Sequence, residues 1–286
     1  MGRALRVRLV ATGAIVAVAA VSCGSSAPPR RAIPPPQTTV STTTTTTTVP
    51  GGTTTVPGST TTVPRPTTTV APPLSTVPAA PATLITKGRT NSKVVALTFD
   101  AGSDAGRTTE ILRILADNHI RATFSLTGIW AQSNPALVKQ IAAGGHQIVN
   151  HSWDHKSFTG YSSKTVPLTA AQITRELVET DAILRSLTGA GTQGWFRPPY
   201  GDRSTSVDQV AGAAGYRYDL MWTVDTLGWK GVSTETVVQR SLSVLGPGEI
   251  ILMHVGSAST DAAALPALIA ALKARGYSFA SVASMV

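Results

Sequence analysis

The stretch Val94-Val95-Ala96-Leu97-Thr98-Phe99-Asp100 sets the fold class, because it is a short apolar run that ends on a carboxylate, with a glycine soon after. A run of this length, rich in β-branched residues, predicts a buried strand over 94–99. Similar runs predict strands over 122–126, 147–150, 194–197, 220–224, 250–253 and 278–282. The spacing of apolar residues predicts helices that begin at a Thr108 or Thr109 cap and over 135–143, 170–187, 207–214, 234–245 and 262–274. About seven strands alternating with helices indicate an α/β protein with a parallel sheet, either open or closed into a barrel.

Five side chains capable of chemistry stand at the ends of predicted strands: Asp100, His151, Arg197, Asp225 and His254. In parallel α/β barrels the carboxyl ends of the strands lie at one rim, where reactive residues gather. We therefore expect these side chains, which are far apart in the chain, to converge on one site.

Two imidazoles stand four residues apart in His151-Ser152-Trp153-Asp154-His155, directly after a predicted strand. Neutral imidazole nitrogens suit zinc and similar metals. Two histidines with this spacing also occur on ordinary surface loops. Three of the five histidines lie at or just past predicted strand ends, which favours a metal site and acid–base chemistry.

The composition excludes several other classes of protein. The chain has 286 residues and a net charge of +9, but residues 1–82 carry six Arg and no acidic residue, whereas the rest carries 18 basic and 15 acidic residues. No basic stripe with interleaved aromatic residues indicates nucleic-acid binding, so no nucleic-acid partner is expected. The single cysteine, Cys23, excludes a disulfide framework and a cysteine-based structural zinc site.

The N-terminus has the pattern of a secretory signal. Arg3, Arg6 and Arg8 precede an apolar run over 9–21, which as a helix would reach about 20 Å, short of the ~30 Å hydrocarbon core. Small residues then lead to Cys23, a pattern that resembles the lipobox of bacterial lipoproteins. We predict a signal peptide over 1–22 and lipidation of Cys23, so that the protein is secreted and anchored on the outer face of the bacterial cytoplasmic membrane. The alternative is a plain signal peptide in which Cys23 is incidental.

A tether follows the signal. Residues 25–82 contain no Trp, Tyr, Phe, Asp or Glu, and residues 38–69 contain 18 Thr, so this stretch lacks the apolar surface that a folded domain needs. Val-Pro pairs recur at multiples of seven residues, and proline-rich chains of this kind act as extended spacers that suit O-glycosylation. We predict a disordered tether over 23–87 that lets a domain over 88–286 reach into the cell wall.

Five blocks of the C-terminal part together resemble the polysaccharide deacetylase family with the NodB homology domain, also called carbohydrate esterase family 4. The blocks are Thr98-Phe99-Asp100, the His151 and His155 pair, Arg197-Pro198-Pro199-Tyr200-Gly201, Asp225-Thr226-Leu227-Gly228-Trp229 and Leu252-Met253-His254. They occur in the order of that family and cover nearly all of 93–286. The resemblance implies a distorted (β/α) barrel, which agrees with about seven alternating strands.

The resemblance also implies catalytic roles. Asp100 would be the general base that activates the attacking water, and His254 the general acid that protonates the leaving amine. Arg197 would hold Asp100 ionised, and Asp225 would orient His254 and support its protonated form. An amide is a poor electrophile, so its hydrolysis requires a Lewis acid, an activated water and a proton for the nitrogen.

The remaining motif residues would form the substrate pocket. By the same resemblance, the backbone N–H of Tyr200 would help to stabilise the oxyanion, and Trp229 and Leu252 would line a pocket for the acetyl methyl group. Taken without the family, Trp229 and Leu252 are ordinary core residues, and Tyr200-Gly201 is an ordinary turn.

His151 and His155 would be ligands of a divalent metal, for which zinc is the first choice. Where the family usually has a second aspartate directly after the base, this chain has Ala101, whose methyl group binds no metal. We expect Asp104, three residues further in the same glycine-containing loop, to supply the missing oxygen. The alternatives are water in that position, or Asp100 acting directly as a ligand.

These features predict a metal-dependent deacetylase that removes acetyl groups from N-acetylated sugars of a cell-wall polysaccharide, first of all peptidoglycan. The tether and the anchor favour a polymeric substrate, and chitin-like or O-acetylated glycans also fit. Two other functions stay open: a catalytically inactive glycan-binding module, suggested by Ala101, and an amidase for a small molecule. Besides the glycan and the membrane, no obligate protein partner is expected.

Overall fold

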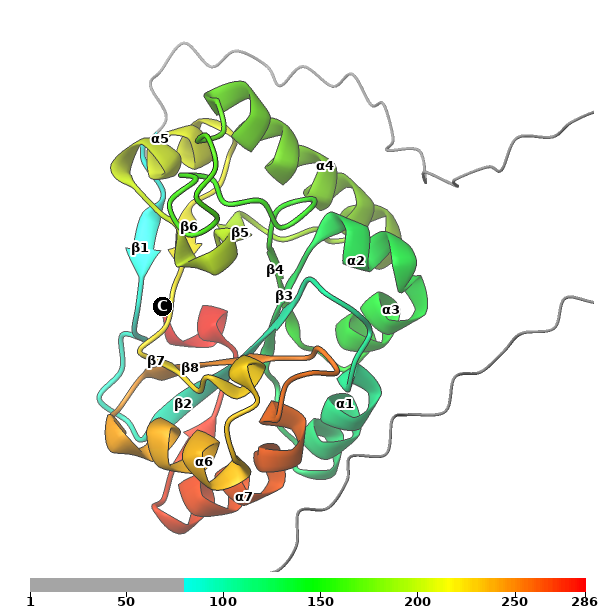
Figure 1. Cartoon of the computed structure of the whole chain (residues 1–286). Helices are drawn as coiled ribbons and strands as arrows, with labels where there is room; N and C mark the ends of the chain where they lie inside the picture. The colour runs from blue at the N-terminus through cyan, green and yellow to red at the C-terminus, as the bar shows by residue number, and fades with distance from the viewer. Residues whose placement is uncertain (1–79) are drawn as a thin grey trace, which may run out of the picture. The chain divides into compact units, whose positions relative to one another are not determined.

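The computed structural model describes residues 80–286, in which one parallel sheet is surrounded by helices (Figure 1). The predictions for the signal peptide over 1–22, for Cys23 and for most of the tether lie outside the described residues. No helix within 80–286 is long and apolar enough to cross a membrane.

The sheet has nine strands within these residues, and its order is β1-β6-β5-β4-β3-β2-β8-β7, with β9 beside the start of β2. The strands are β1 (Thr83–Ile85), β2 (Val94–Ala101), β3 (Thr123–Leu126), β4 (Gln147–Asn150), β5 (Trp195–Phe196), β6 (Tyr218–Leu220), β7 (Val224–Asp225), β8 (Glu249–His254) and β9 (Ser278–Phe279). Every pairing between them is parallel. The predicted α/β class with a parallel sheet is confirmed.

Seven α-helices within the described residues connect the strands and lie outside the sheet (Figure 1). They are α1 (Thr108–Asp117), α2 (Gly128–Ser133), α3 (Pro135–Ala143), α4 (Ala170–Thr188), α5 (Thr205–Ala213), α6 (Thr234–Ser243) and α7 (Asp261–Ala274). The helix predicted over 135–143 is confirmed at both ends. The six residues of α2 are too few to show helical periodicity, which explains why no helix is predicted there.

The predicted threonine cap of α1 is wrong. Arg107 occupies the N-cap position and makes no side-chain cap. Thr108 instead donates its hydroxyl to the carbonyl of Ala105, at 2.6 Å. Thr108 is already the first residue of the helix, one position too late to cap it, so the helix begins without a side-chain cap.

The strand predicted over 220–224 is wrong as a single strand, and its division shapes the barrel. β6 pairs with β1 and β5, whereas β7 pairs with β8 at the other end of the sheet. The residues between them cross from one end to the other, because the Met221 N–H donates to Ile85 (2.8 Å) and the Thr223 N–H donates to Ile250 (2.9 Å). This bent segment links the two edges of the sheet and produces the expected distorted barrel.

Strand β1 lies inside 23–87, the range predicted as tether, so the folded part begins before residue 88. Thr83 and Ile85 pair with Tyr218 and Leu220 of β6. The segment is short and its neighbours have the composition of the tether, so the sequence gives no separate strand signal there.

Strand β2 places the chemistry of the site. Its alternate residues from Val95 to Ala101 belong to the main core, where they pack with side chains of α1, α3 and α7. In that core Phe99 stacks on Phe124 of β3, with ring centroids 5.2 Å apart. The residues between them face the barrel interior, since successive side chains of a strand point to opposite faces. The last of these inward residues is Asp100, at the carboxyl end of the strand.

A separate group of buried charges lies where β6 meets α5. Asp219 is fully buried and accepts a hydrogen bond from Nε of Arg203 (2.7 Å), and the same guanidinium also pairs with Asp208. Two carboxylates thus share one cation. Burial raises the pKa of Asp219 to about 7 in spite of Arg203, and the charge of Asp208 adds to this rise.

We predict that Asp219→Asn makes stability less dependent on pH. The unfolded carboxyl ionises near 3.8, whereas the folded one stays protonated to about 7, so stability falls as the pH rises between these values. Asparagine mimics the protonated carboxyl and has no such transition. Between about pH 4 and pH 8, the Tm of the wild type should fall more than that of the variant, and the two decreases should differ by at least about 2–4 °C. Equal decreases in the two proteins would contradict the raised pKa.

Candidate active site

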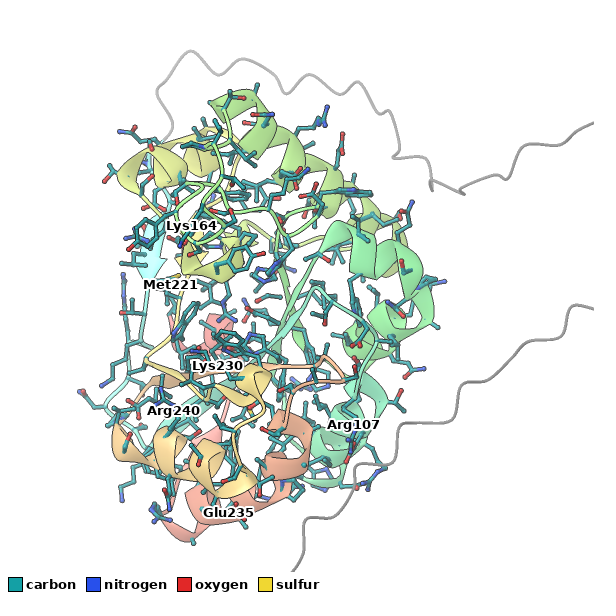
Figure 2. The ribbon with its side chains drawn as sticks, viewed as in Figure 1. Arg107, Lys164, Met221, Lys230, Glu235 and Arg240 are labelled. Atoms are coloured by element: carbon teal, nitrogen blue, oxygen red, sulfur yellow. The ribbon has the colours of Figure 1, made fainter. Side chains whose placement is uncertain are left out.

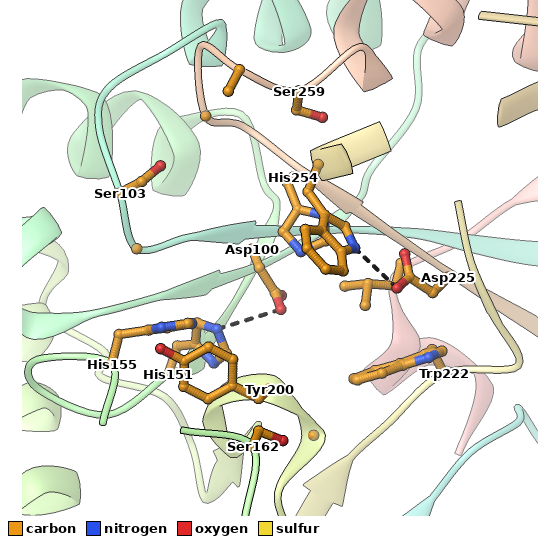
Figure 3. A pocket seen from close by; sticks show the side chains of 16 residues that line it. Asp100, Ser103, His151, His155, Ser162, Tyr200, Trp222, Asp225, His254 and Ser259 are labelled. Atoms are coloured by element: carbon orange, nitrogen blue, oxygen red, sulfur yellow. Dashed lines mark hydrogen bonds and ion pairs between the residues drawn. The ribbon is translucent and has the colours of Figure 1, made fainter. Parts of the chain in front are cut away.

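A cavity of about 610 Å³ lies at the carboxyl ends of the central strands (Figure 3). Eight of the predicted site residues line it: Asp100, His151, His155, Tyr200, Asp225, Trp229, Leu252 and His254. Arg197 is fully buried directly against Asp100. The five sequence blocks therefore meet around one cavity.

Asp100 is held in a buried ion pair with Arg197. Nη1 of the guanidinium lies 2.6 Å from Oδ1 of the carboxylate. Other donors of Arg197 reach the carbonyl of Leu220 (3.0 Å) and the hydroxyl of Thr98 (3.1 Å). Burial by itself would raise the pKa of Asp100, but the guanidinium and the neighbouring imidazoles lower it to about 2. The carboxylate is therefore ionised at neutral pH and can accept a proton.

His151 offers one ring nitrogen to the cavity. Its Nδ1 lies 2.8 Å from the carbonyl oxygen of Arg197, which only accepts hydrogen bonds, so Nδ1 carries the proton. Nε2 keeps its lone pair and lies 3.4 Å from Oδ2 of Asp100 (Figure 3). Burial lowers the pKa of His151, which keeps the ring neutral. Two electron-rich atoms thus face each other across a gap that a cation would stabilise.

His155 places a second neutral imidazole beside the first. The two rings meet edge to face, with centroids 4.8 Å apart. Burial and the nearby His151 lower the pKa of His155 to about 3. The segment that carries both rings is an irregular loop, since Ser152 and His155 have positive φ angles of 65° and 62°. This loop brings together two rings that an extended strand would hold about 13 Å apart on one face.

The donor atoms beside His151 are of the kind that a divalent metal needs. Two neutral imidazoles beside a carboxylate oxygen suit a cation of the zinc type. Within residues 80–286, no group of three or more His, Cys, Asp or Glu side chains is arranged to hold a metal ion. The residues that could hold such a cation are His151 and His155, with the carboxylate of Asp100 beside them.

The prediction that Asp104 supplies a third ligand is wrong in this structure. Its Oδ1 accepts the Ser257 N–H (2.9 Å), its Oδ2 accepts the Ser257 hydroxyl, and its side chain does not line the cavity. Asp104 thereby fastens the loop after β2 to the loop after β8. Ala101 offers no replacement, because it faces the core on the side of β2 opposite to Asp100.

His254 stands beside Asp100, its register partner on the neighbouring strand. Its Nδ1 is buried, and Oδ2 of Asp261 lies 3.7 Å from it. Burial disfavours the charged ring, but the carboxylates of Asp261, Asp100 and Asp225 outweigh burial and raise the pKa of His254. His254 therefore holds its proton to a higher pH than an ordinary histidine.

The resemblance implies that Asp225 orients His254. Within residues 80–286, however, the carboxylate of Asp225 makes its hydrogen bonds to other residues. Its Oδ1 accepts the Leu227 N–H (2.8 Å) and its Oδ2 accepts Nε1–H of Trp229 (3.1 Å). Its backbone carbonyl accepts Nε–H of Arg240 from α6 (3.0 Å; Arg240 is labelled in Figure 2). Asp225 therefore holds the Trp229 wall of the cavity and acts on His254 through its charge.

Trp222 and Asp261 are among the residues of the site that the sequence prediction does not include. Trp222 lines the cavity and lies 5.7 Å from the guanidinium of Arg197. It falls in the middle of a run that the sequence predicts as one strand, so nothing marks it as special. Asp261 begins α7, where an acidic residue is common because it favours the positive end of the helix dipole. Tyr200 lines the cavity as expected, with φ of 61°, and the oxyanion role of its N–H stays a prediction.

A parallel α/β barrel with an ionised aspartate, two neutral imidazoles and a proton-holding histidine at its strand ends has the groups that hydrolysis by acid–base chemistry needs. The chain belongs to the polysaccharide deacetylase family, whose sequence pattern matches residues 87–218.

Relatives of known structure or name place the chain more closely. A peptidoglycan-N-acetylglucosamine deacetylase of Bacillus cereus is 34% identical over 202 residues, which cover 69% of this chain and 70% of the relative. The structure of a family 4 carbohydrate esterase from Streptomyces lividans in complex with acetate matches with a TM-score of 0.58 and 34% identity, over 67% of this chain and 93% of that one. A pseudoenzyme of the same family from Bacillus anthracis matches with a TM-score of 0.64 and 30% identity, over 72% and 69%. The chain thus resembles both enzymes and a pseudoenzyme.

We predict that Arg197→Met destabilises the fold, because it leaves the Asp100 carboxylate buried without its partner. The free energy of unfolding should fall by about 3–5 kcal/mol, the usual cost of breaking a buried ion pair on one side. Denaturation in urea would measure this change.

The double variant Arg197→Met with Asp100→Asn is the matched control for this prediction. It removes both charges and should recover part of the lost stability. A double variant that loses as much as the sum of the two single variants would contradict the coupling of the pair.

Proposed function

We propose that this protein hydrolyses the N-acetyl groups of sugars in a cell-wall polysaccharide, with peptidoglycan as the first candidate. The observation that carries the proposal is the placement of Asp100 and His254 side by side on β2 and β8, at one cavity. Their surroundings lower the pKa of Asp100 and raise that of His254. These shifts favour Asp100 as the proton acceptor and His254 as the proton donor.

The residues divide the reaction between them. Asp100 takes a proton from the water that attacks the acetyl carbonyl, while Arg197 keeps the carboxylate oriented and ionised. His254 gives its proton to the sugar nitrogen as the carbon–nitrogen bond breaks, so the free amine and acetate leave. The Tyr200 N–H stabilises the oxyanion, and Trp229 and Leu252 enclose the acetyl methyl group.

His151 and His155 would hold a divalent metal, for which zinc is the first candidate because both ligands are neutral imidazoles. When bound, the metal supplies a Lewis acid that polarises the acetyl carbonyl and favours ionisation of water. The lone pair of His151 Nε2, which faces the carboxylate of Asp100, supports this assignment.

Peptidoglycan is favoured by the Bacillus cereus relative, which carries that substrate in its name. The N-terminal sequence supports the same choice. A signal peptide over 1–22, a lipid on Cys23 and the Thr/Pro-rich tether would anchor the protein outside the cytoplasmic membrane and let the barrel reach the wall.

A second candidate function is a glycan-binding module without catalysis. Two observations favour it: Ala101 stands at the usual third ligand position, and one similar structure is a pseudoenzyme. The opposite pKa shifts of the neighbouring Asp100 and His254 argue against it, because binding alone needs neither a proton acceptor nor a proton donor.

We predict that His254→Ala lowers acetate release from purified peptidoglycan by about 10²–10⁴-fold, the usual contribution of a general acid. His119→Ala is the matched control, because this exposed histidine lies outside the cavity. Circular dichroism would verify that both variants fold. Full activity of the His254 variant would reject the proposed acid, and a wild type that binds glycan without releasing acetate would favour the binding module.

We predict that replacing His155 lowers the metal content of the protein and that replacing Asp104 does not. The protein purified with zinc should carry one equivalent, His155→Ala should lose most of it, and Asp104→Ala should keep it because that carboxylate already binds Ser257. Elemental analysis measures the zinc directly and does not depend on activity. Loss of zinc in the Asp104 variant would instead show that Asp104 is a metal ligand in the wild type.

A further inference from the structure

The carboxylate of Asp261, at the start of α7, is fully buried and joins three segments of the chain. Its Oδ2 accepts the backbone N–H of His254 (2.8 Å) and the hydroxyl of Ser259 (2.9 Å). Its Oδ1 accepts the hydroxyl of Thr226 (2.7 Å), which follows β7. Asp261 therefore fixes the end of β8, where the proposed general acid stands.

The same carboxylate also faces the imidazole ring of His254. Oδ2 of Asp261 lies 3.7 Å from Nδ1, and Nδ1 is buried with no hydrogen-bond partner among residues 80–286. In that part of the chain no lysine or arginine lies within 4.0 Å of Asp261. A buried carboxylate without a cationic neighbour is costly, so the His254 ring is the group that can balance its charge.

The backbone around Asp261 leaves room for little else. A Cβ added to Gly228 would lie 2.2 Å from Oδ1 of Asp261, so only glycine permits this approach. The N–H of Thr260 donates to the carbonyl of Gly228 (3.2 Å) and holds the two segments together. The close packing keeps water away from the carboxylate, which strengthens its effect on the ring.

Asp225 does not face the His254 ring in this way: within residues 80–286, Asp261 is the carboxylate that lies within 4.0 Å of a ring nitrogen of His254. One oxygen of Asp225 accepts the Leu227 N–H and the other accepts the indole N–H of Trp229. The carboxylate that the family resemblance assigns to His254 thus supports the cavity wall.

We infer that Asp261 is the residue that positions His254 as the general acid, a role that rests on the proposed deacetylase function. Asp261 faces Nδ1 and leaves Nε2 as the nitrogen available to the cavity. The proton passes from Nε2 to the leaving nitrogen as the carbon–nitrogen bond breaks, and Asp261 itself neither gains nor loses a proton. Acetate and the free amine are the products.

The test compares two acetyl substrates that differ in their need for an acid. An amine leaves only when protonated, whereas 4-nitrophenolate leaves from 4-nitrophenyl acetate without a proton. In the full-length protein, Asp261→Asn should lower kcat for an N-acetylated chitooligosaccharide by about 10²-fold, with KM and the activity on 4-nitrophenyl acetate unchanged. Asparagine has the same shape, and the hydroxyl of Thr226 can turn to accept its N–H.

Two further variants separate positioning from a general loss of structure. Thr226→Val removes a buried hydrogen bond to Asp261 but keeps its charge, so it should lower Tm and leave both activities in place. Asp225→Asn loosens Trp229, a wall of the cavity that both substrates enter, and removes a charge that acts on His254 from a distance. It should impair both substrates, with a smaller amide-selective loss than Asp261→Asn. An equal loss on both substrates in the Asp261 variant, no loss on either, or an amide-selective loss in the Asp225 variant alone would overturn the inference.

A nuclear magnetic resonance measurement keeps the inference testable without activity. The ¹⁵N resonance of His254 Nδ1 should move in Asp261→Asn and stay close to the wild-type position in Asp225→Asn. If the wild type releases no acetate, the proposed function fails, and this comparison still decides which carboxylate faces the ring. A resonance that moves only in the Asp225 variant would overturn the role of Asp261.

Discussion

The buried ion pair between Asp100 and Arg197 is the interaction on which the rest of the site depends. A carboxylate taken out of water is costly unless a cation and hydrogen bonds compensate it. The guanidinium of Arg197 supplies both the cation and a hydrogen bond to Asp100. The backbone carbonyl of Arg197 has a second role, because it fixes the proton of His151 on Nδ1. The same guanidinium donates to Leu220 and Met221, at the point where the chain turns from β6 toward β7. One residue, Arg197, therefore links the closure of the barrel to the ionisation of the proposed base and to the tautomer of one proposed metal ligand.

The site keeps two groups of opposite protonation close together by giving them different neighbours. Asp100 has a guanidinium and two imidazoles around it, and its pKa is low. His254 has the buried carboxylate of Asp261 at its Nδ1, and its pKa is raised. Catalytic acids and bases in one cavity commonly depend on such a division.

The sequence predicts the parts of this molecule that are set by local pattern. The helix over 135–143 and the strand over 147–150 are confirmed at both ends, since each has its own apolar spacing and its own bounding residues. The rim of reactive residues is predicted as well, because parallel strands bring their carboxyl ends together.

Features set by distant contacts could not be predicted in this way. The run over 220–224 has the composition of one strand, but pairing with β1 on one side and β8 on the other bends it in the middle. The side chain of Asp104 binds Ser257, 153 residues away in the chain. Asp261 reaches His254 only because α7 contacts the end of β8. Neither Ser257 nor His254 can be recognised as a partner from sequence spacing alone.

The most direct test of the account is a crystal structure of the protein soaked with zinc and acetate, with anomalous diffraction to locate the metal. The account predicts one zinc peak bound by Nε2 of His151 and by the ring of His155, with acetate between Asp100 and His254. Zinc bound elsewhere in the barrel, or acetate outside the cavity that Asp100 and His254 line, would contradict it.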